Sequence, residues 1–306
     1  MSVAGGGSGA ALGELSESGW KPAGPAQPGR RHKRGLLASV GLHGWLLVWV
    51  VIAIFPITWL FITSFKPYEY VLSNEIKLID HPTIDNYRAV LFDTDFPKWI
   101  LNSIIVSVLT MALGIIISAS AGYAMSRFRF PGHRPLMWTF LITQMFPIAI
   151  LIVPLYNIFA NLSLLNQVWA LPLAYMSTVV PFCTWMLKGY FDTVPIDIDE
   201  AGRVDGLTPF GTFWRLIVPL ARPGLAVTAF YTFLTAWGEV AYATVFLSSP
   251  DKYTVAVGMQ TWVGQFRTEW HWLSAGAIIV TVPSVIVFLL VQKNLVAGLT
   301  AGGTKG

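Results

Sequence analysis

The sequence predicts an all-α integral membrane protein with six transmembrane helices and both termini in the cytoplasm. Of its 306 residues, 54% are hydrophobic and only 12% are charged, whereas a soluble domain carries about 25% charged residues. Long apolar runs alternate with short polar segments. A helix needs roughly 20 apolar residues to cross a bilayer, and each run is long enough. The expected spans are 42–65, 99–126, 135–160, 167–187, 219–248 and 272–293.

The positions of the basic residues predict the orientation. With the N-terminus inside, most of the 20 Lys and Arg residues fall on inner segments, as is usual for cytoplasmic loops. The net charge of +4 therefore reflects topology and not nucleic-acid binding. This orientation makes 1–34 a disordered basic cytoplasmic tail, 35–297 the six-span domain and 298–306 a cytoplasmic C-terminal tail.

The second expected span carries a face of small residues. Gly114, Ser118 and Gly122 recur at intervals of four residues, so they lie on one side of a helix. Small side chains at this spacing let two membrane helices approach closely. We therefore expect this face to pack tightly against a neighbouring helix.

A polar segment separates the fourth and fifth spans. Pro195 can open a helix that Gly206 ends, and Thr208 followed by Pro209 is typical of a second helix start. The second helix leads through Pro219 into the fifth span. An apolar stripe at helical spacing marks this second helix: Phe210, Phe213, Trp214 and Ile217.

Two interpretations of this segment differ in whether it has a partner. It can be a cytoplasmic loop whose two helices rest at the membrane surface. However, a helix that only lies on lipid is typically basic, whereas this segment places the small pair Ala201 and Gly202 beside the acidic Glu200. Small residues let another protein approach the backbone, and the acid offers a site for its Arg or Lys. The pattern favours docking.

Several motifs resemble a known family. The stretch EAGRVDG…LIVPLARP resembles the cytoplasmic signature of ABC-importer permeases, with Gly202 in place of the usual second Ala. The motifs SFKP, NSIIVS and AGYAMSRFRFPG and the ending GLTAGGTKG resemble the second membrane subunit of maltose-type carbohydrate importers. Together these motifs extend over nearly the whole chain after residue 40.

The resemblance implies an importer subunit in the cell membrane for a carbohydrate such as maltose, maltodextrin or trehalose. The implied partners are a second permease, two ATPase subunits that hold ATP and Mg, an extracytoplasmic sugar-binding protein and membrane lipid. The chain lacks the phosphate-binding motif GxxxxGK[ST]. We therefore expect that it is not itself an enzyme and that it holds no cofactor or metal of its own. The implied ATPase-coupling residues are Glu200, Ala201, Gly202, Asp205, Gly206 and Pro219.

Glu239, together with Trp237, is the candidate for the substrate pathway. A lone ionisable side chain in a span usually faces protein or water, and the family often has Trp-Asn-Glu where this chain has Trp237-Gly238-Glu239. The carboxylate can accept hydrogen bonds from sugar hydroxyls, or it can bond to the partner permease. A rival hypothesis is a self-contained secondary carrier that uses Glu239 to couple ions.

The loop 249–272 is the candidate contact for the binding protein. The resemblance places such a contact here, and we expect it at 257–266, with Trp270 and Trp272 as anchors at the membrane interface. Gly258 and Gly264 bracket the expected tip, which runs from Met259 to Val263. The contact residues expected there are Gly258, Met259, Gln260, Thr261 and Trp262.

Overall fold

The computed structural model describes residues 36–71 and 81–302, and the predicted N-terminal tail 1–34 lies outside them. The described chain forms two units, which divide between Ile54 and Phe55. The first unit contains the start of α1 (Leu36–Ser64), and the second contains the rest of the described chain. Within the described ranges the backbone is helical, and the only pairing of β type is an isolated bridge between Val263 and Thr268.

Four helices are long and apolar enough to cross a membrane, and two bent pairs bring the total to as many as six. The four are α1, α4 (Phe96–Arg127), α7 (Leu171–Phe191) with the preceding turn η1 (Val168–Ala170), and α14 (Trp270–Gly302). The bent pairs are α5 (His133–Thr143) with α6 (Ile148–Asn161), and α9–α10 (Pro209–Leu220) with α11 (Arg222–Trp237).

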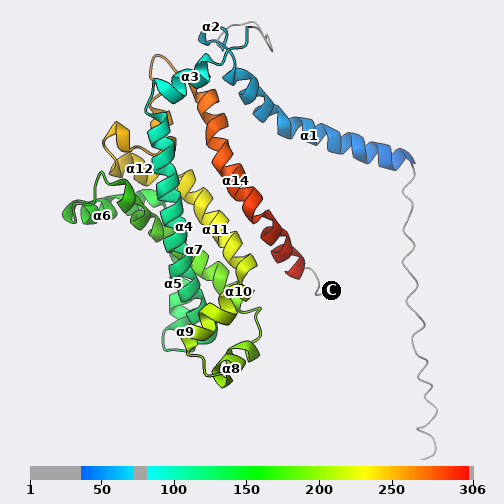
Figure 1. Cartoon of the computed structure of the whole chain (residues 1–306), viewed down its shortest axis with the longest axis vertical. Coiled ribbons are helices and arrows are strands. Elements are labelled where there is room, and N and C mark those ends of the chain that lie inside the picture. Colours follow the sequence, from blue (N-terminus) through cyan, green and yellow to red (C-terminus); the bar gives the residue numbers. More distant parts are fainter. Residues whose placement is uncertain (1–35, 72–80, 303–306) are drawn as a thin grey trace, which may run out of the picture. The chain divides into compact units, whose positions relative to one another are not determined.

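The helices α4 and α7 form the centre of the second unit (Figure 1), and the predicted small-residue face joins them. A side chain on Gly114 would meet Val179 at 3.0 Å, and one on Gly122 would meet the backbone nitrogen of Lys188 at 3.1 Å. The Ser118 hydroxyl donates to the carbonyl of Val180 over 3.4 Å. The expectation of close packing along this face is confirmed.

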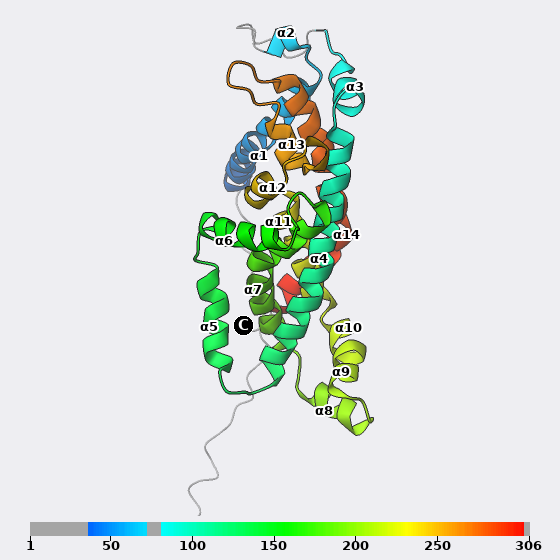
Figure 2. The same cartoon turned by 90° about the vertical axis from the view of Figure 1, so that its left-hand side faces the viewer.

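The expected third span is not one straight helix. The axes of α5 and α6 differ by 103° (Figure 2). The helix stops because Pro147 takes an extended conformation, with ψ of 133°, and a proline disfavours helix in the residue before it. The side chain of Gln144 donates to the carbonyl of Thr178 over 3.1 Å, which ties the bend to α7.

The expected fifth span is also interrupted. The helix bends by 81° at Ala221, between Pro219 and Pro223, before α11 continues to Trp237. A further short helix, α12 (Ala241–Phe246), follows after a break of three residues. The break places Glu239 at the start of α12, and this decides what its carboxylate contacts.

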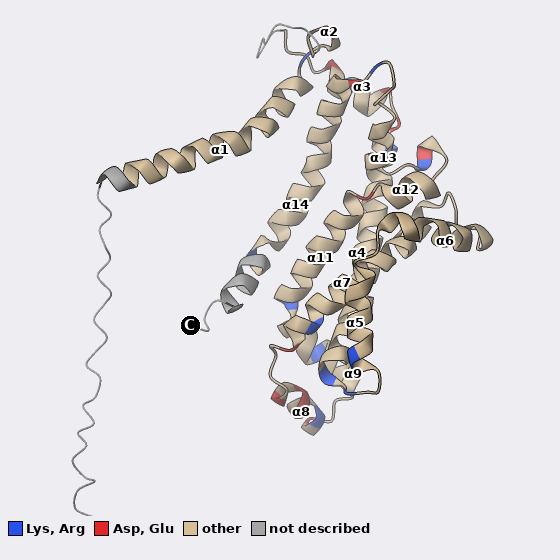
Figure 3. Ribbon diagram, turned by 180° about the vertical axis from the view of Figure 1, so that it is seen from behind, with Lys and Arg blue, Asp and Glu red and all other residues tan. Residues whose placement is uncertain are grey.

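The remaining elements lie at the two ends of α4 (Figure 1). At one end are α2 (Tyr68–Val71) and α3 (Asp85–Phe92), together with η3 (Pro250–Lys252) and α13 (Val255–Gln260). At the other end are α8 (Asp197–Val204) and α9 (Pro209–Thr212), followed by the π-helical turn η2 (Phe213–Ile217) and α10 (Val218–Leu220). Charged residues of the described chain gather mostly toward these two ends (Figure 3).

Candidate functional site

The polar segment folds as two short helices joined by a glycine turn, as predicted. Gly206 has φ of +79°, a conformation that side chains disfavour, and it follows the end of α8. The Thr208 hydroxyl accepts the N–H of Gly211 over 3.1 Å and so caps α9. The backbone N–H of Leu207 donates to the carbonyl of Gly202 over 2.9 Å. These bonds fold the second helix back against the first.

The predicted apolar stripe is split between two environments. Phe213 and Ile217 are buried against α4 and α7, but Phe210 is 71% exposed and Trp214 is 44% exposed. The aromatic members of the stripe still contact one another, with ring centroids 6.2 Å apart for Phe210 and Trp214 and 5.4 Å apart for Phe213 and Trp214. Only Phe213 and Ile217 are buried by the rest of the described chain.

A buried ion pair fastens α8 to α4. The carboxylate of Asp199 accepts a hydrogen bond from the Tyr123 hydroxyl at 2.6 Å and from Arg127 Nε at 2.8 Å. The side chains of Arg127 and Asp199 are 9% and 6% exposed. Arg127 also donates to the carbonyl of Val194, over 2.9 Å. Asp199 is therefore the acid of α8 that orients the helix.

Sequence reasoning missed this network, although a signal for it was present. Tyr123 and Arg127 are four residues apart and so lie on one face of a helix. Both belong to the motif AGYAMSRFRFPG, but nothing in the sequence distinguishes Asp199 from the neighbouring acids Asp197 and Glu200. The spacing of Tyr123 and Arg127 predicts a shared acceptor, and the chain order alone does not say which acid it is.

The expected coupling residues divide into exposed and buried groups. Glu200 and Ala201 are exposed on α8, Asp205 is exposed directly after it, and Pro219 is exposed on α10. Gly202 is buried, and a side chain there would meet Thr212 Oγ1 at 2.7 Å and Leu216 at 3.1 Å. The small size of Gly202 therefore serves packing within this chain and not the approach of another protein, whereas Ala201 remains open to one.

The structure separates the two residues expected along the substrate pathway. Trp237 packs with Phe233 and Trp99 in an apolar cluster, with ring centroids of Trp237 and Phe233 5.5 Å apart. Glu239 instead caps α12, because its carboxylate oxygens accept the N–H groups of Tyr242 at 2.8 Å and Ala243 at 3.2 Å. The carboxylate thus has backbone partners in its own chain.

A capping role for Glu239 predicts a graded response to substitution. We expect Glu239→Ala to lower the free energy of unfolding by about 1–2 kcal/mol, because both acceptors of the α12 N–H groups are lost. Glu239→Gln keeps one acceptor oxygen and is expected to cost less than half as much. Thermal unfolding of the purified chain measures both, with the exposed Glu69→Ala as the control. Equal losses in the Ala and Gln variants would contradict the capping role.

The loop 249–272 protrudes at a different place from the one expected. A side chain on Gly258 would overlap the ring of Trp99, at 2.1 Å, and the Trp262 ring stacks on Phe96 with centroids 5.7 Å apart. Both residues are buried, so the expectation that they are surface contacts is corrected. Met259 is half-buried, whereas Gln260 and Thr261 are exposed.

The exposed tip of this loop is the turn Val263–Thr268. The N–H of Gly264 donates to the carbonyl of Arg267 over 2.9 Å and closes the turn. Phe266, within the expected contact range, is 97% exposed. The Arg267 guanidinium lies 4.2 Å from the centre of the Tyr68 ring and pairs with Glu269 at 2.7 Å. The turn is thus held at its base while an aromatic side chain projects from it.

Comparison with known proteins establishes the family. Residues 113–300 match the family described as the inner membrane component of binding-protein-dependent transport systems. The chain belongs to this family. The matched range contains every residue that the sequence singled out for coupling, for the substrate pathway and for contact with a binding protein. The resemblance found in the motifs is confirmed, and this inner membrane component resides in the cell membrane.

The sequence similarity to individual relatives extends over most of this chain. The chain is 34% identical to the galactooligosaccharides transport system permease protein of Bacillus subtilis, over 84% of this chain and 92% of that protein. It is 35% identical to the maltodextrin transport system permease protein of Streptococcus pneumoniae, over 90% of this chain and 98% of that protein.

A solved structure shares the fold. A chain in the crystal structure of a bacterial ABC transporter involved in the import of the acidic polysaccharide alginate matches with a TM-score of 0.74. The match covers 85% of this chain and 96% of that chain, at 21% sequence identity. At this identity the match supports the arrangement of helices alone.

Proposed function

We propose that this inner membrane component is one of two membrane subunits of an ABC importer for carbohydrate, an oligosaccharide such as maltose, maltodextrin or trehalose. The names of its relatives, which transport galactooligosaccharides and maltodextrin, support this substrate class. The observation that carries the proposal is the two-helix segment α8–α9, which is fastened to α4 by the buried Asp199–Arg127 pair and leaves Glu200 and Ala201 exposed.

The exposed surface of this segment supports docking onto an ATPase subunit. Val204 is 87% exposed and Phe210 is 71% exposed, beside the acidic Glu200 and Asp205. Exposed large apolar side chains among charged ones are typical of a protein interface. Glu200 then offers the charged contact, and Ala201 permits close approach.

Movement of the docked ATPase subunits can be transmitted to two helices of the membrane domain, α4 and α11. The ion pair of Asp199 with Arg127 links α8 to α4, and the chain continues from α9 through Pro219 to α11. Because the buried pair resists separation, α8 and the end of α4 move as one body. ATP-driven closure would then rotate α4 and α11 together, a rigid-body change between inward- and outward-open states.

The proposal includes the remaining partners and the orientation. ATP and Mg reside on the two ATPase subunits, so transport belongs to the assembly and the chain alone is no enzyme. A second permease completes the membrane domain, and both termini lie in the cytoplasm. An extracytoplasmic sugar-binding protein contacts the loop 249–272, now narrowed to Gln260, Thr261 and the turn with Phe266.

The rival carrier hypothesis is not supported. A carrier that couples ions through Glu239 needs this carboxylate to be available, but both of its oxygens accept backbone N–H groups of α12. The family is one of binding-protein-dependent transport systems, in which this chain is the membrane component.

The deciding experiment measures ATP-dependent sugar uptake by vesicles that contain the full assembly. We expect Glu200→Ala to reduce uptake at least tenfold and to reduce co-purification of the ATPase, while the amount of chain in the membrane stays the same. The control is Asp93→Ala, which removes an exposed acid at the opposite end of α4. Normal uptake with normal ATPase retention in Glu200→Ala would refute the role of this residue in docking.

A further inference from the structure

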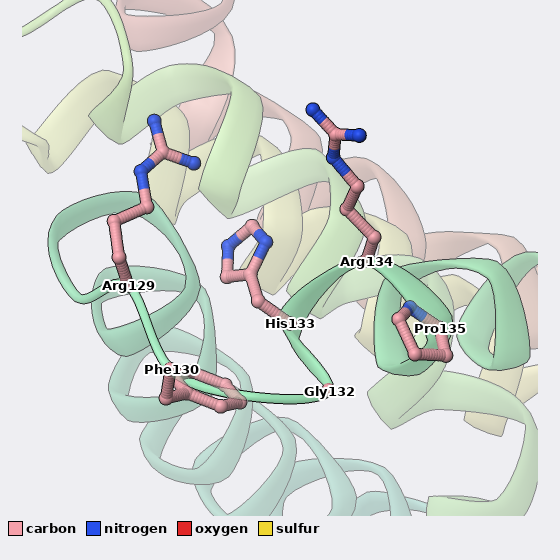
Figure 4. A pocket seen from close by; sticks show the side chains of 6 residues that line it. All are labelled: Arg129, Phe130, Gly132, His133, Arg134 and Pro135. Carbon is pink, nitrogen blue, oxygen red and sulfur yellow. The ribbon is translucent and has the colours of Figure 1, made fainter.

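The turn between α4 and α5 contains a basic hollow that the proposed transport function does not use. Its volume is about 550 Å³. Figure 4 shows the side chains of Arg129, His133 and Arg134 reaching toward one side of the turn, with Phe130 on the other. The lining residues are Arg129, Phe130, Gly132, His133, Arg134 and Pro135.

The two arginines of this hollow carry charges that nothing in the described chain neutralises. Arg127, the neighbouring basic residue on α4, is paired with Asp199. Arg129 and Arg134 are exposed, and neither has an ion pair or side-chain hydrogen bond with another described residue. Two unneutralised guanidinium groups at one hollow favour an anion, and a guanidinium matches the geometry of phosphate oxygens.

The walls of the hollow are held in place. The His133 Nε2–H donates to the carbonyl of Met125 at 2.7 Å, and its ring meets the edge of Phe130 with centroids 5.5 Å apart. The backbone N–H of His133 donates to the carbonyl of Phe130 over 3.1 Å. Gly132 has φ of +90°, which glycine adopts without strain. The turn therefore presents its arginines from a fixed frame.

The helix that leaves this turn presents an apolar surface beside it. On α5, Trp138 is 65% exposed and Ile142 is 50% exposed, and these two residues are four positions apart on one face of the helix. A charged hollow followed by an apolar helix face matches a molecule with an anionic head and hydrocarbon tails. Trp138 follows Arg134 by about one helical turn, and an exposed Trp this close to a basic turn is typical of the level of lipid headgroups.

We propose that this hollow binds the phosphate headgroup of an anionic phospholipid, with Arg129 and Arg134 donating to the phosphate oxygens and the acyl chains lying along α5. Basic pockets at the ends of membrane helices bind such headgroups. The two-helix segment does not cover this site, because α5 and α8 lie on opposite sides of the lower end of α4 (Figure 2). A lipid there would anchor the turn beside the helix that carries Arg127.

Native mass spectrometry of the purified full chain tests this proposal. The probes are dioleoyl phosphatidylglycerol, dioleoyl phosphatidylcholine and inorganic phosphate, each titrated separately. We expect the first phosphatidylglycerol to bind at least tenfold more tightly than phosphatidylcholine. We expect the double variant Arg129→Gln/Arg134→Gln to lower the affinity for phosphatidylglycerol at least tenfold, because each arginine near a lipid phosphate contributes several-fold.

A matched control separates a site from general charge. The double variant Arg222→Gln/Lys293→Gln removes two exposed basic residues elsewhere on the chain, and we expect it to change the affinity less than twofold. Equal weakening in both double variants would overturn the proposal, as would no preference for phosphatidylglycerol in the native chain. Inorganic phosphate that binds as tightly as the lipid would mean a site for free phosphate instead. Equal melting temperatures of the three proteins check that the fold is intact.

Discussion

Replacing Asp199 with asparagine is expected to lower the free energy of unfolding by about 3–5 kcal/mol and to abolish ATP-dependent uptake. The carboxylate of Asp199 is 6% exposed and lies 2.8 Å from Arg127 Nε. The amide of asparagine removes the charge that balances the buried guanidinium, and an uncompensated buried charge costs this much. With α8 loosened from α4, movement of the ATPase subunits would no longer reach α4. Thermal unfolding and vesicle uptake measure the two effects.

A control and a double variant distinguish loss of the ion pair from loss of an acid. Asp197→Asn removes an exposed acid from the same helix and is expected to change stability by less than about 0.5 kcal/mol. Arg127→Gln combined with Asp199→Asn leaves no unpaired charge, so its cost is expected to be smaller than the sum of the two single costs. Additive costs, or normal stability in Asp199→Asn, would show that the ion pair does not hold α8.

The local chemistry of the two-helix segment α8–α9 could be predicted, but its tertiary partners could not. Thr208, Pro209 and Gly206 act through their own backbone, so the glycine turn and the cap follow from adjacent residues. Whether Asp199 or Glu200 is the buried acid depends on Tyr123 and Arg127, which lie more than 70 positions earlier in the chain. Neighbouring acids on one helix have the same local pattern, and only packing decides which is buried.

The same distinction explains the errors in the membrane helices. A run without charged residues shows only how long an apolar segment is, and 135–160 has the length of one span. The sequence pattern does not show that this segment bends sharply at Pro147, where Gln144 contacts α7. The small-residue face of α4 was predictable because Gly114, Ser118 and Gly122 repeat at a fixed interval. Trp237 and Glu239 are neighbours in sequence, but the end of α11 between them directs them to different surroundings.

Replacing Gly202 with valine is expected to disrupt the packing inside the two-helix segment α8–α9. A Cβ atom at this position would meet Thr212 Oγ1 at 2.7 Å, Thr212 Cγ2 at 3.0 Å and Leu216 at 3.1 Å, and the valine methyl groups extend further. Thr212 is buried and its β-branched side chain has few other rotamers in a helix. We expect a loss of about 1–3 kcal/mol in the free energy of unfolding, as is typical of overpacking, together with reduced uptake.

Variants of the neighbouring residue separate packing from docking. Ala201→Val adds the same kind of bulk one position earlier, where the residue is exposed, so stability is expected to stay within about 0.5 kcal/mol while ATPase co-purification falls. Shortening the Thr212 side chain makes room for a Cβ atom at position 202. The double variant Gly202→Ala/Thr212→Ala is therefore expected to be more stable than Gly202→Ala alone. If Gly202→Val is as stable as the native chain yet loses the ATPase, Gly202 belongs to the docking surface after all. If both residues tolerate valine without effect on uptake, neither close packing nor close approach at α8 limits coupling.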